Sequence, residues 1–267
     1  MISEPLRRPP ETIQLQQGTH ETFEEGVCAM ELVAWMAHEK HSDHPQCASL
    51  AIGEFVRILN DDFDDESRQM LSPYLGRIVG TRGTSDQETE RSWKALDWYC
   101  RVSLPAWLRS AGLIAEAGAV EATAPIVGRA SALAAQDSLE RAQARAEAAR
   151  AAVEVAAGES AEAATAAAEA TRAAGEVAAR AVAGVAGGIA AVGVNRDAMG
   201  AARAATADAA WAAAMRGETL RPTVAALQRS ALELLHRMIR VTETANAHSG
   251  SGEASRTQPA ALLGDPS

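Results

Sequence analysis

Aromatic residues are scarce in this sequence, and they are unevenly placed. Of the three Phe, two Tyr and five Trp among its 267 residues, all but Trp211 lie between Phe23 and Trp107. A core built on large side chains is therefore expected only in that part of the chain. We expect one packed core of fewer than about 100 residues, followed by a long alanine-rich appendage.

Cysteines are few, and no apolar run is long enough for a membrane. Three cysteines are an odd number, which excludes a disulfide scaffold and favours reduced thiols and a cytoplasmic location. The longest uncharged apolar run covers residues 181–194. It is shorter than the roughly 20 residues that span a bilayer, so we expect no membrane association. The N-terminal residues also lack the apolar stretch of a secretory signal.

An excess of basic residues is absent as well. The formal net charge is −10, and residues 20–70 hold twelve acids against Lys40, Arg57 and Arg68. Nucleic-acid binding needs Lys and Arg to neutralise phosphates, so we expect no nucleic-acid partner. We interpret the acids as solvated helix faces and helix N-termini, with an arginine-rich partner as the alternative.

Helical spacing predicts an all-α fold whose first part is a small bundle. Residues 1–20 are expected to be flexible, and residues 21–114 to form a compact domain of four to six short helices. The first helix should cover residues 21–40, and Ser42 or Asp43 should cap the second. Another helix should be reset at Ser72–Pro73, and residues 85–88 have the sequence of a capping box.

Residues 115–216 are dominated by alanine, the best helix former, and should form long helical arms. Acids at seven-residue spacing predict a solvent-facing stripe; they are Glu140, Glu147, Glu154 and, after one skipped residue, Glu162, Glu169 and Glu176. A glycine cluster then favours a turn between two antiparallel arms, as in a hairpin or a coiled-coil-like pair; it comprises Gly184, Gly187, Gly188 and Gly193. One long helix is the alternative.

The strongest periodic pattern lies in residues 217–246, which predict an amphipathic C-terminal helix ahead of a disordered tail at 247–267. Its apolar residues alternate at spacings of four and three; they are Leu220, Val224, Leu227, Ala231, Leu234, Met238 and Val241. This seam either packs back on the bundle or pairs with a second copy of the chain.

Histidines cluster where the first helix should end, together with an acid and a thiol. The candidate metal ligands are His38, His41, Asp43, His44 and Cys47. Imidazole and thiolate are preferred ligands of zinc, so zinc or iron is the candidate ion, although no cofactor is specified. The alternative is a helix stop and start in which Cys47 is a small core residue.

Glu31 is the only fixed charge between Gly26 and His38, and it shares a helix face with Cys28 and Trp35. A buried carboxylate there would need a partner or a raised pKa, which marks it as a site candidate. It could pair with Arg57, Arg77 or Arg101, or line a small-ligand pocket. A cysteine–histidine nucleophile has no supporting oxyanion hole in the sequence, and the loop at residues 76–84 is not a P-loop.

Two stretches resemble a known group of proteins. They are Glu-Gly-Val-Cys-Ala-Met-Glu-Leu-Val-Ala at residues 25–34 and His-Ser-Asp-His-Pro-Gln-Cys at residues 41–47. With the alanine-rich middle, the chain resembles Ala-rich proteins of high-GC actinobacteria and their phages. The resemblance implies no activity, ligand or catalytic residue.

The sequence therefore predicts a non-enzymatic helical interaction or assembly protein, acting through a protein partner or through self-association. The alternative is a metal-binding helical domain, enzymatic or not, with its site at residues 38–47.

Overall fold

The protein is all helical. The computed structural model describes residues 5–157, 193–216 and 218–254, and within these ranges every regular element is a helix. None of the helices found there combines the length and the apolar character that a membrane crossing requires.

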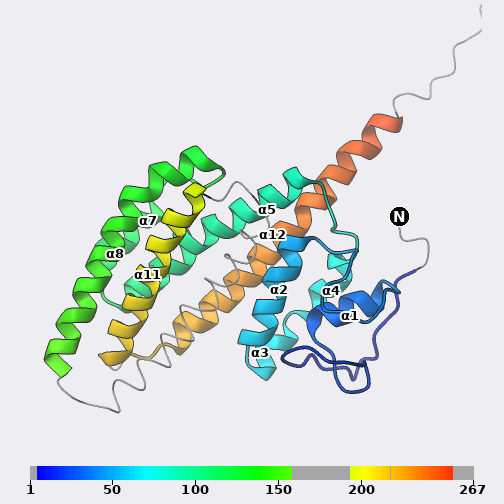
Figure 1. The fold of residues 1–267 in the computed structure, drawn as a ribbon, viewed down its shortest axis with the longest axis horizontal. Helices are drawn as coiled ribbons and strands as arrows, with labels where there is room; N and C mark the ends of the chain where they lie inside the picture. The colour runs from blue at the N-terminus through cyan, green and yellow to red at the C-terminus, as the bar shows by residue number, and fades with distance from the viewer. Residues whose placement is uncertain (1–4, 158–192, 217, 255–267) are drawn as a thin grey trace, which may run out of the picture.

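Short helices come first along the chain and long ones last (Figure 1). Their bounds are α1 Ala29–Met36, α2 Leu50–Asp62, α3 Asp65–Gln69, α4 Ser72–Ile78, α5 Ser85–Trp98, the π-helix η1 Tyr99–Ser103, α6 Leu104–Ser110, α7 Ile114–Glu121, α8 Arg129–Ala157, α11 Gly193–Met215 and α12 Arg221–Ala254. α5, η1 and α6 follow one another without a gap. Pro105 has no N–H to give to the preceding turn, and a π-turn at this place absorbs the missing bond.

Helix starts follow from local capping, which differs from the prediction at two places. α1 begins at Ala29 and not at residue 21, because Gly26 has φ +152° and extended Cys28 is the N-cap. Ser49 caps α2, so the expected cap at Ser42 or Asp43 is wrong. The reset at Ser72–Pro73 is confirmed, with α4 beginning at Ser72. The capping box of α5 is made by Thr84 and Gln87, one residue earlier than expected.

A buried arginine joins the short helices to α12. Arg91, in α5, is 0% exposed; its Nε donates to the Met238 carbonyl (3.1 Å) and its Nη2 to the Thr242 hydroxyl. Its Nη1 donates to Glu88 Oε1 at 2.9 Å. Burial lowers the pKa of Arg91 and the Glu88 carboxylate opposes that shift, so the guanidinium stays charged.

Glu88 extends this network to α2. Its Oε2 accepts from the Ser49 hydroxyl (2.7 Å) and from the Ala51 N–H (3.0 Å), at the N-terminus of α2. Thr242 also donates to the Thr81 carbonyl at 3.3 Å. One connected set of hydrogen bonds therefore holds α2, α5, the loop before α5 and α12 together.

The apolar seam of α12 packs back on the bundle. Ala231, Leu234, Met238 and Val241 are buried, and the three earlier seam residues pack against the same core. The core runs from Leu15 to Ile239 and includes alanines of α8 and α11, so the alanine-rich part is not a separate appendage. Self-association through this seam is therefore not supported, because α5, α2 and α6 already cover it.

Small residues let α8 and α11 pack side by side. Buried residues of α8 recur at alternating spacings of three and four, and they are Ala132, Ala135, Leu139, Ala142 and Ala146. α11 lies between α8 and the η1–α6 segment, and its facing residues are also mostly alanine. On the outer face of α8, Glu140, Glu147 and Glu154 are exposed, which confirms the solvent-facing stripe where it is described.

The prediction of a simple hairpin does not describe α8 and α11. Figure 1 shows that the two helices run in the same direction, so they are not the antiparallel arms of one hairpin. Arg150 of α8 contacts Asp208 at 3.1 Å and lies over the Trp211 ring of α11. Gly193 is the first residue of α11; the other turn glycines (184, 187, 188) and Glu162, Glu169 and Glu176 lie outside the described residues.

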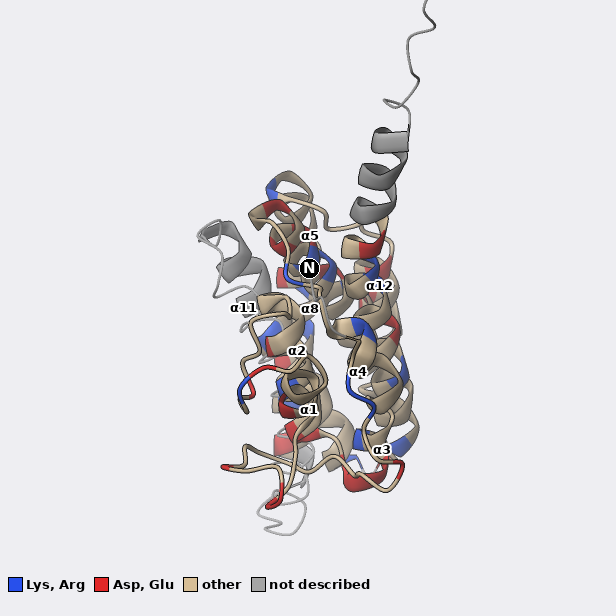
Figure 2. Ribbon diagram, turned by 90° about the vertical axis from the view of Figure 1, so that its right-hand side faces the viewer, with Lys and Arg blue, Asp and Glu red and all other residues tan. Residues whose placement is uncertain are grey.

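The acids of residues 20–70 lie mainly on loops and helix ends around α1 and α3 (Figure 2). Asp64, for example, is the N-cap of α3, and its carboxylate accepts the Ser67 N–H at 2.7 Å. Hydrogen bonds from Ser67 lower the pKa of Asp64, as expected for a cap. The interpretation of the acids as helix N-termini is confirmed at Asp64, whereas the acids at residues 21–25 lie on a loop and not on the expected solvated helix face.

Replacing Arg91 with Met should destabilise the protein strongly, because it leaves Glu88, Thr242 and a carbonyl of α12 without their donor. We expect a loss of about 3 kcal/mol in urea unfolding followed by circular dichroism. The matched control is Lys94→Met on the same helix, whose exposed ion pair with Glu90 should contribute less than about 1 kcal/mol. Equal effects of the two substitutions would contradict this role for Arg91.

Candidate functional site

The predicted metal ligands at residues 38–47 do not converge. His38 adopts φ +60°, and its Nε2 lies 3.0 Å from the Pro5 carbonyl. His44 Nδ1 pairs with its neighbour Asp43 at 2.6 Å, and the Cys47 N–H donates to Glu39. Across the described ranges, no three His, Cys, Asp or Glu side chains are placed to hold a metal ion. The zinc or iron site is therefore not assembled in this structure.

Glu31 is the buried carboxylate that the sequence predicted, but its partners are different. It is 1% exposed; its Oε1 accepts the His20 N–H (2.7 Å), and its Oε2 accepts the Cys28 N–H (2.8 Å) and faces His20 Nδ1 (2.9 Å). His41 Nε2 lies 3.7 Å away and bonds the His20 carbonyl. The expected arginine partners pair elsewhere: Arg57 with Glu54, Arg77 with Glu243 and Arg101 with Asp97.

Glu31, Cys28 and His20 form a closely packed, hydrogen-bonded cluster, the Glu31 latch, which ties the loop before α1 to the start of that helix. Burial alone would raise the pKa of Glu31, but the hydrogen bonds from Cys28 and His20 outweigh it and lower the pKa. A Cβ on Gly26 would meet Gln16 Oε1 at 2.3 Å and His20 Cδ2 at 2.6 Å, so the side chains are closely packed there. Phe23 stacks on Trp35 with ring centroids 5.2 Å apart. The small-ligand pocket expected around Glu31, Cys28 and Trp35 is therefore filled by the chain itself.

The thiols are poorly suited to nucleophilic chemistry. Burial raises the pKa of Cys28 and of Cys100 to about 12, and that of Cys47 to about 11. A thiolate is the reactive form, and raised pKa values keep these groups protonated at neutral pH. Cys28 instead caps α1, with its Sγ accepting the Glu31 N–H at 3.4 Å.

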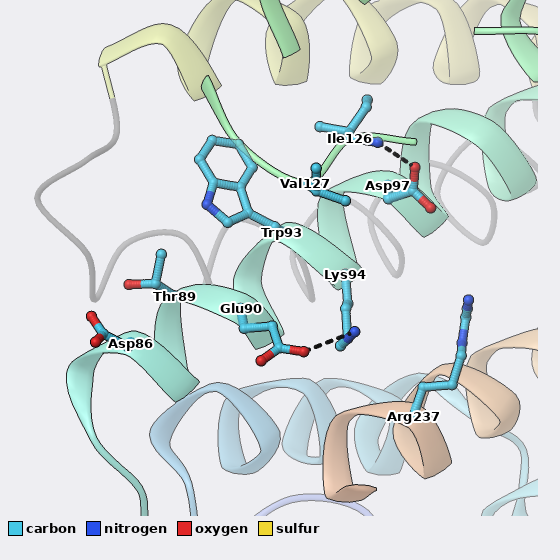
Figure 3. Close-up of a pocket in the computed structure, with 9 residues that line it drawn as sticks. All are labelled: Asp86, Thr89, Glu90, Trp93, Lys94, Asp97, Ile126, Val127 and Arg237. Carbon is cyan, nitrogen blue, oxygen red and sulfur yellow. Dashed lines mark hydrogen bonds and ion pairs between the residues drawn. The ribbon is translucent and has the colours of Figure 1, made fainter. Parts of the chain in front are cut away.

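A cleft of about 520 Å³ lies along the outer face of α5 (Figure 3). Its lining residues on α5 recur at the spacing of one helix face; they are Asp86, Thr89, Glu90, Trp93, Lys94 and Asp97. Ile126 and Val127 form a second wall, and Arg237 of α12 closes one end. Its volume is in the range of ligand-binding clefts.

Hydrogen bonds fix the walls of this cleft. Asp97 Oδ1 accepts the Ile126 N–H at 2.8 Å, which ties the segment before α8 to α5. The Ser131 hydroxyl accepts the N–H groups of Val127 and Gly128 at 3.0 and 3.1 Å. Arg237 adjoins Met238, whose carbonyl is held by Arg91. The cleft is thus set by the same tertiary contacts that hold the bundle.

The cleft combines an apolar centre with charges of both signs. Trp93 is half-buried and Val127 is 74% exposed, so the apolar wall is open to solvent. Glu90 and Lys94 pair across one turn at 3.0 Å. Figure 3 places Asp86 at one end of the cleft and Arg237 at the other, with Trp93 and Val127 between them. Its ionisable lining groups are the carboxyl groups of Asp86, Glu90 and Asp97 and the cations Lys94 and Arg237.

The sequence analysis did not find this cleft. Trp93 has the helical spacing of a core residue, with Leu96 three positions on, and it does pack against the core. Only the tertiary structure shows that it also lines a cleft. The sequence did contain one indication of the cleft: Asp86, Glu90, Lys94 and Asp97 share the helix face of Trp93. Comparison of the chain with protein-family models, curated proteins and solved structures gave no match.

Replacing Glu31 with Gln should weaken the protein in a pH-dependent way. The folded state lowers the pKa of this carboxyl from 4.5, so its contribution is present above that value and is lost as the pH falls further. We expect Glu31→Gln to cost about 2 kcal/mol at pH 7, and the difference from wild type to shrink below pH 4.5. Urea unfolding between pH 7 and pH 3 measures this difference in the free energy of unfolding.

Glu24→Gln, at an exposed acid near the cluster, is the control and should change little at any pH. A difference between wild type and Glu31→Gln that is absent at pH 7, or constant down to pH 3, would argue against the latch.

Proposed function

We propose that this protein is a non-enzymatic helical interaction protein and that its partner, a segment of another protein, docks in the cleft along α5. The cleft is the observation that supports the proposal. It offers a half-buried tryptophan and an exposed valine on fixed walls, surrounded by polar and charged groups. An apolar centre with a polar rim is the usual anatomy of protein interfaces, and tryptophan is prominent among residues that dominate binding energy.

The apolar seam of α12 is not proposed as the interaction surface, because it is buried in the chain's own core. The interaction surface is therefore assigned to residues that remain accessible. Trp93 is half-buried against the core and lines the cleft from a helix whose opposite face carries the buried Arg91 network. A side chain that is already held by its own packing has little conformational freedom left to lose, which lowers the ordering cost of binding.

A catalytic role has less support. The three thiols have raised pKa values, and the buried carboxylate Glu31 is used by backbone N–H groups and His20. The cleft itself holds carboxylates, cations and apolar groups without a nucleophile–base pair. Recognition of a charged, partly apolar segment uses such groups as they stand.

The test is a selection of random 12-residue peptides, displayed on phage, against the immobilised full chain. We expect enriched peptides to bind with micromolar dissociation constants, because a flexible peptide loses conformational entropy when it is ordered on binding. The variant Val127→Asp should weaken them at least tenfold, because it puts a charge on the apolar wall. Fluorescence polarisation with labelled peptides measures the change.

Val155→Asp is the matched control, since Val155 is also an exposed valine (87%) but lies outside the cleft. It should leave binding unchanged. Enriched peptides that bind Val127→Asp and Val155→Asp as tightly as wild type would overturn the proposal, provided both variants keep the wild-type circular dichroism and melting temperature.

A further inference from the structure

The charges of the cleft are separated along its length. Asp86 lies at the end near the start of α5, and Lys94 and Arg237 lie toward the other end (Figure 3). Asp86 and Arg237 are both exposed, so each is accessible to a bound segment. Lys94 pairs with Glu90 only through an exposed contact one turn away, and such pairs are weak enough to be exchanged for a ligand charge.

The acid near the far end is already engaged. Asp97 accepts the Ile126 N–H and an Arg101 guanidinium N–H (3.2 Å), so its charge serves the wall of the cleft. Glu90 and Asp97 are each paired with a cation, Lys94 and Arg101, and Arg237 adds a further positive charge. The end toward Arg237 is therefore positive to a ligand, and the end at Asp86 is negative. Because the charges differ at the two ends, a ligand with a single sign of charge would meet repulsion at one of them.

The shape favours a peptide segment over a small molecule. Val127 is 74% exposed, so a small molecule lying against this wall would keep much of its own surface in water. Pockets for small ligands usually bury most of the ligand. A peptide tolerates an open wall, since its chain continues beyond the contact and only its anchor residue needs cover.

We infer that the cleft binds a peptide segment with an apolar anchor residue between a basic and an acidic residue, the basic one at Asp86 and the acidic one at Lys94 and Arg237. This inference rests on the proposed function and names the chemistry of its partner. Asp86 and Lys94 are eight positions apart on α5, which is about 12 Å along a helix axis. An extended segment covers that length with about four residues, so a basic and an acidic residue four apart match the two ends.

Three labelled peptides test the inference on the full chain. They share flanking glycines and differ in the central five residues: Lys-Gly-Trp-Gly-Glu, Lys-Gly-Trp-Gly-Lys and Glu-Gly-Trp-Gly-Glu. We expect the mixed-charge peptide to bind wild type at least fivefold more tightly than either like-charged peptide. The preference should fall as salt is raised, because exposed charges are screened.

Charge reversal at each end should redirect the preference. Arg237→Glu makes that end of the cleft more negative, so the peptide with two lysines should bind this variant most tightly. Asp86→Lys makes the other end positive, so the peptide with two glutamates should bind that variant most tightly. Arg229→Glu, at an exposed arginine of α12 outside the cleft, is the control and should leave the order of affinities as in wild type.

The outcomes separate the inference from the proposed function. If the three peptides bind equally and Val127→Asp weakens all of them, the cleft binds peptides but the charge assignment is wrong. If none of the three binds while phage-selected peptides do, the inference is overturned and the proposed function stands. If neither these nor selected peptides depend on Val127, both fail.

Discussion

The structure depends on one buried charge. Arg91 reaches from α5 to a carbonyl and a hydroxyl of α12, and its partner Glu88 caps the start of α2. A buried guanidinium is tolerated only if it is hydrogen-bonded, and here each of its three nitrogens donates: to the Met238 carbonyl, to Glu88 and to the Thr242 hydroxyl. Because these acceptors come from separate parts of the chain, the network also fixes where α12 lies, and shifting α12 along α5 would leave Arg91 without its acceptors.

Two consequences follow from the position of α12. Its apolar seam is covered by the bundle, so the C-terminal helix closes the core and is not a surface for a second copy. Arg237, the residue next to Met238, is held at the end of the cleft along α5. The contact that stabilises the fold thereby also places one end of the cleft to which we assign binding.

Patterns of local spacing were good predictors of this fold. Helical periodicity predicted an all-α chain, the acids at seven-residue spacing predicted the exposed stripe of α8, and Ser72–Pro73 marked the start of α4. These features depend on residues within a turn or two of one another. The apolar seam of α12 was also predicted correctly, although periodicity alone did not show whether the bundle or a second copy of the chain would cover it.

Contacts between distant residues escaped the sequence analysis. Glu31 pairs with His20, which precedes α1 in a stretch without regular structure, so no helical spacing relates the two. The first helix was predicted too long because Cys28 is an unusual N-cap and Gly26 adopts a conformation that only the folded loop requires. Arg91 follows a capping sequence and looks like a surface charge, and the cleft needs Ile126 and Val127 beside α5. The burial of Arg91 and the presence of the cleft both depend on segments that are far apart in the sequence, so neither could be predicted from one segment alone.

The central claim is that α12 is packed into its own chain by the Arg91 network. Amide hydrogen exchange followed by mass spectrometry at several protein concentrations tests it most directly. The account predicts that the amides of residues 234–241 are among the slowest to exchange and that their protection is the same at low and high concentration. Protection that falls on dilution would contradict it, because the seam would then be covered by a second copy.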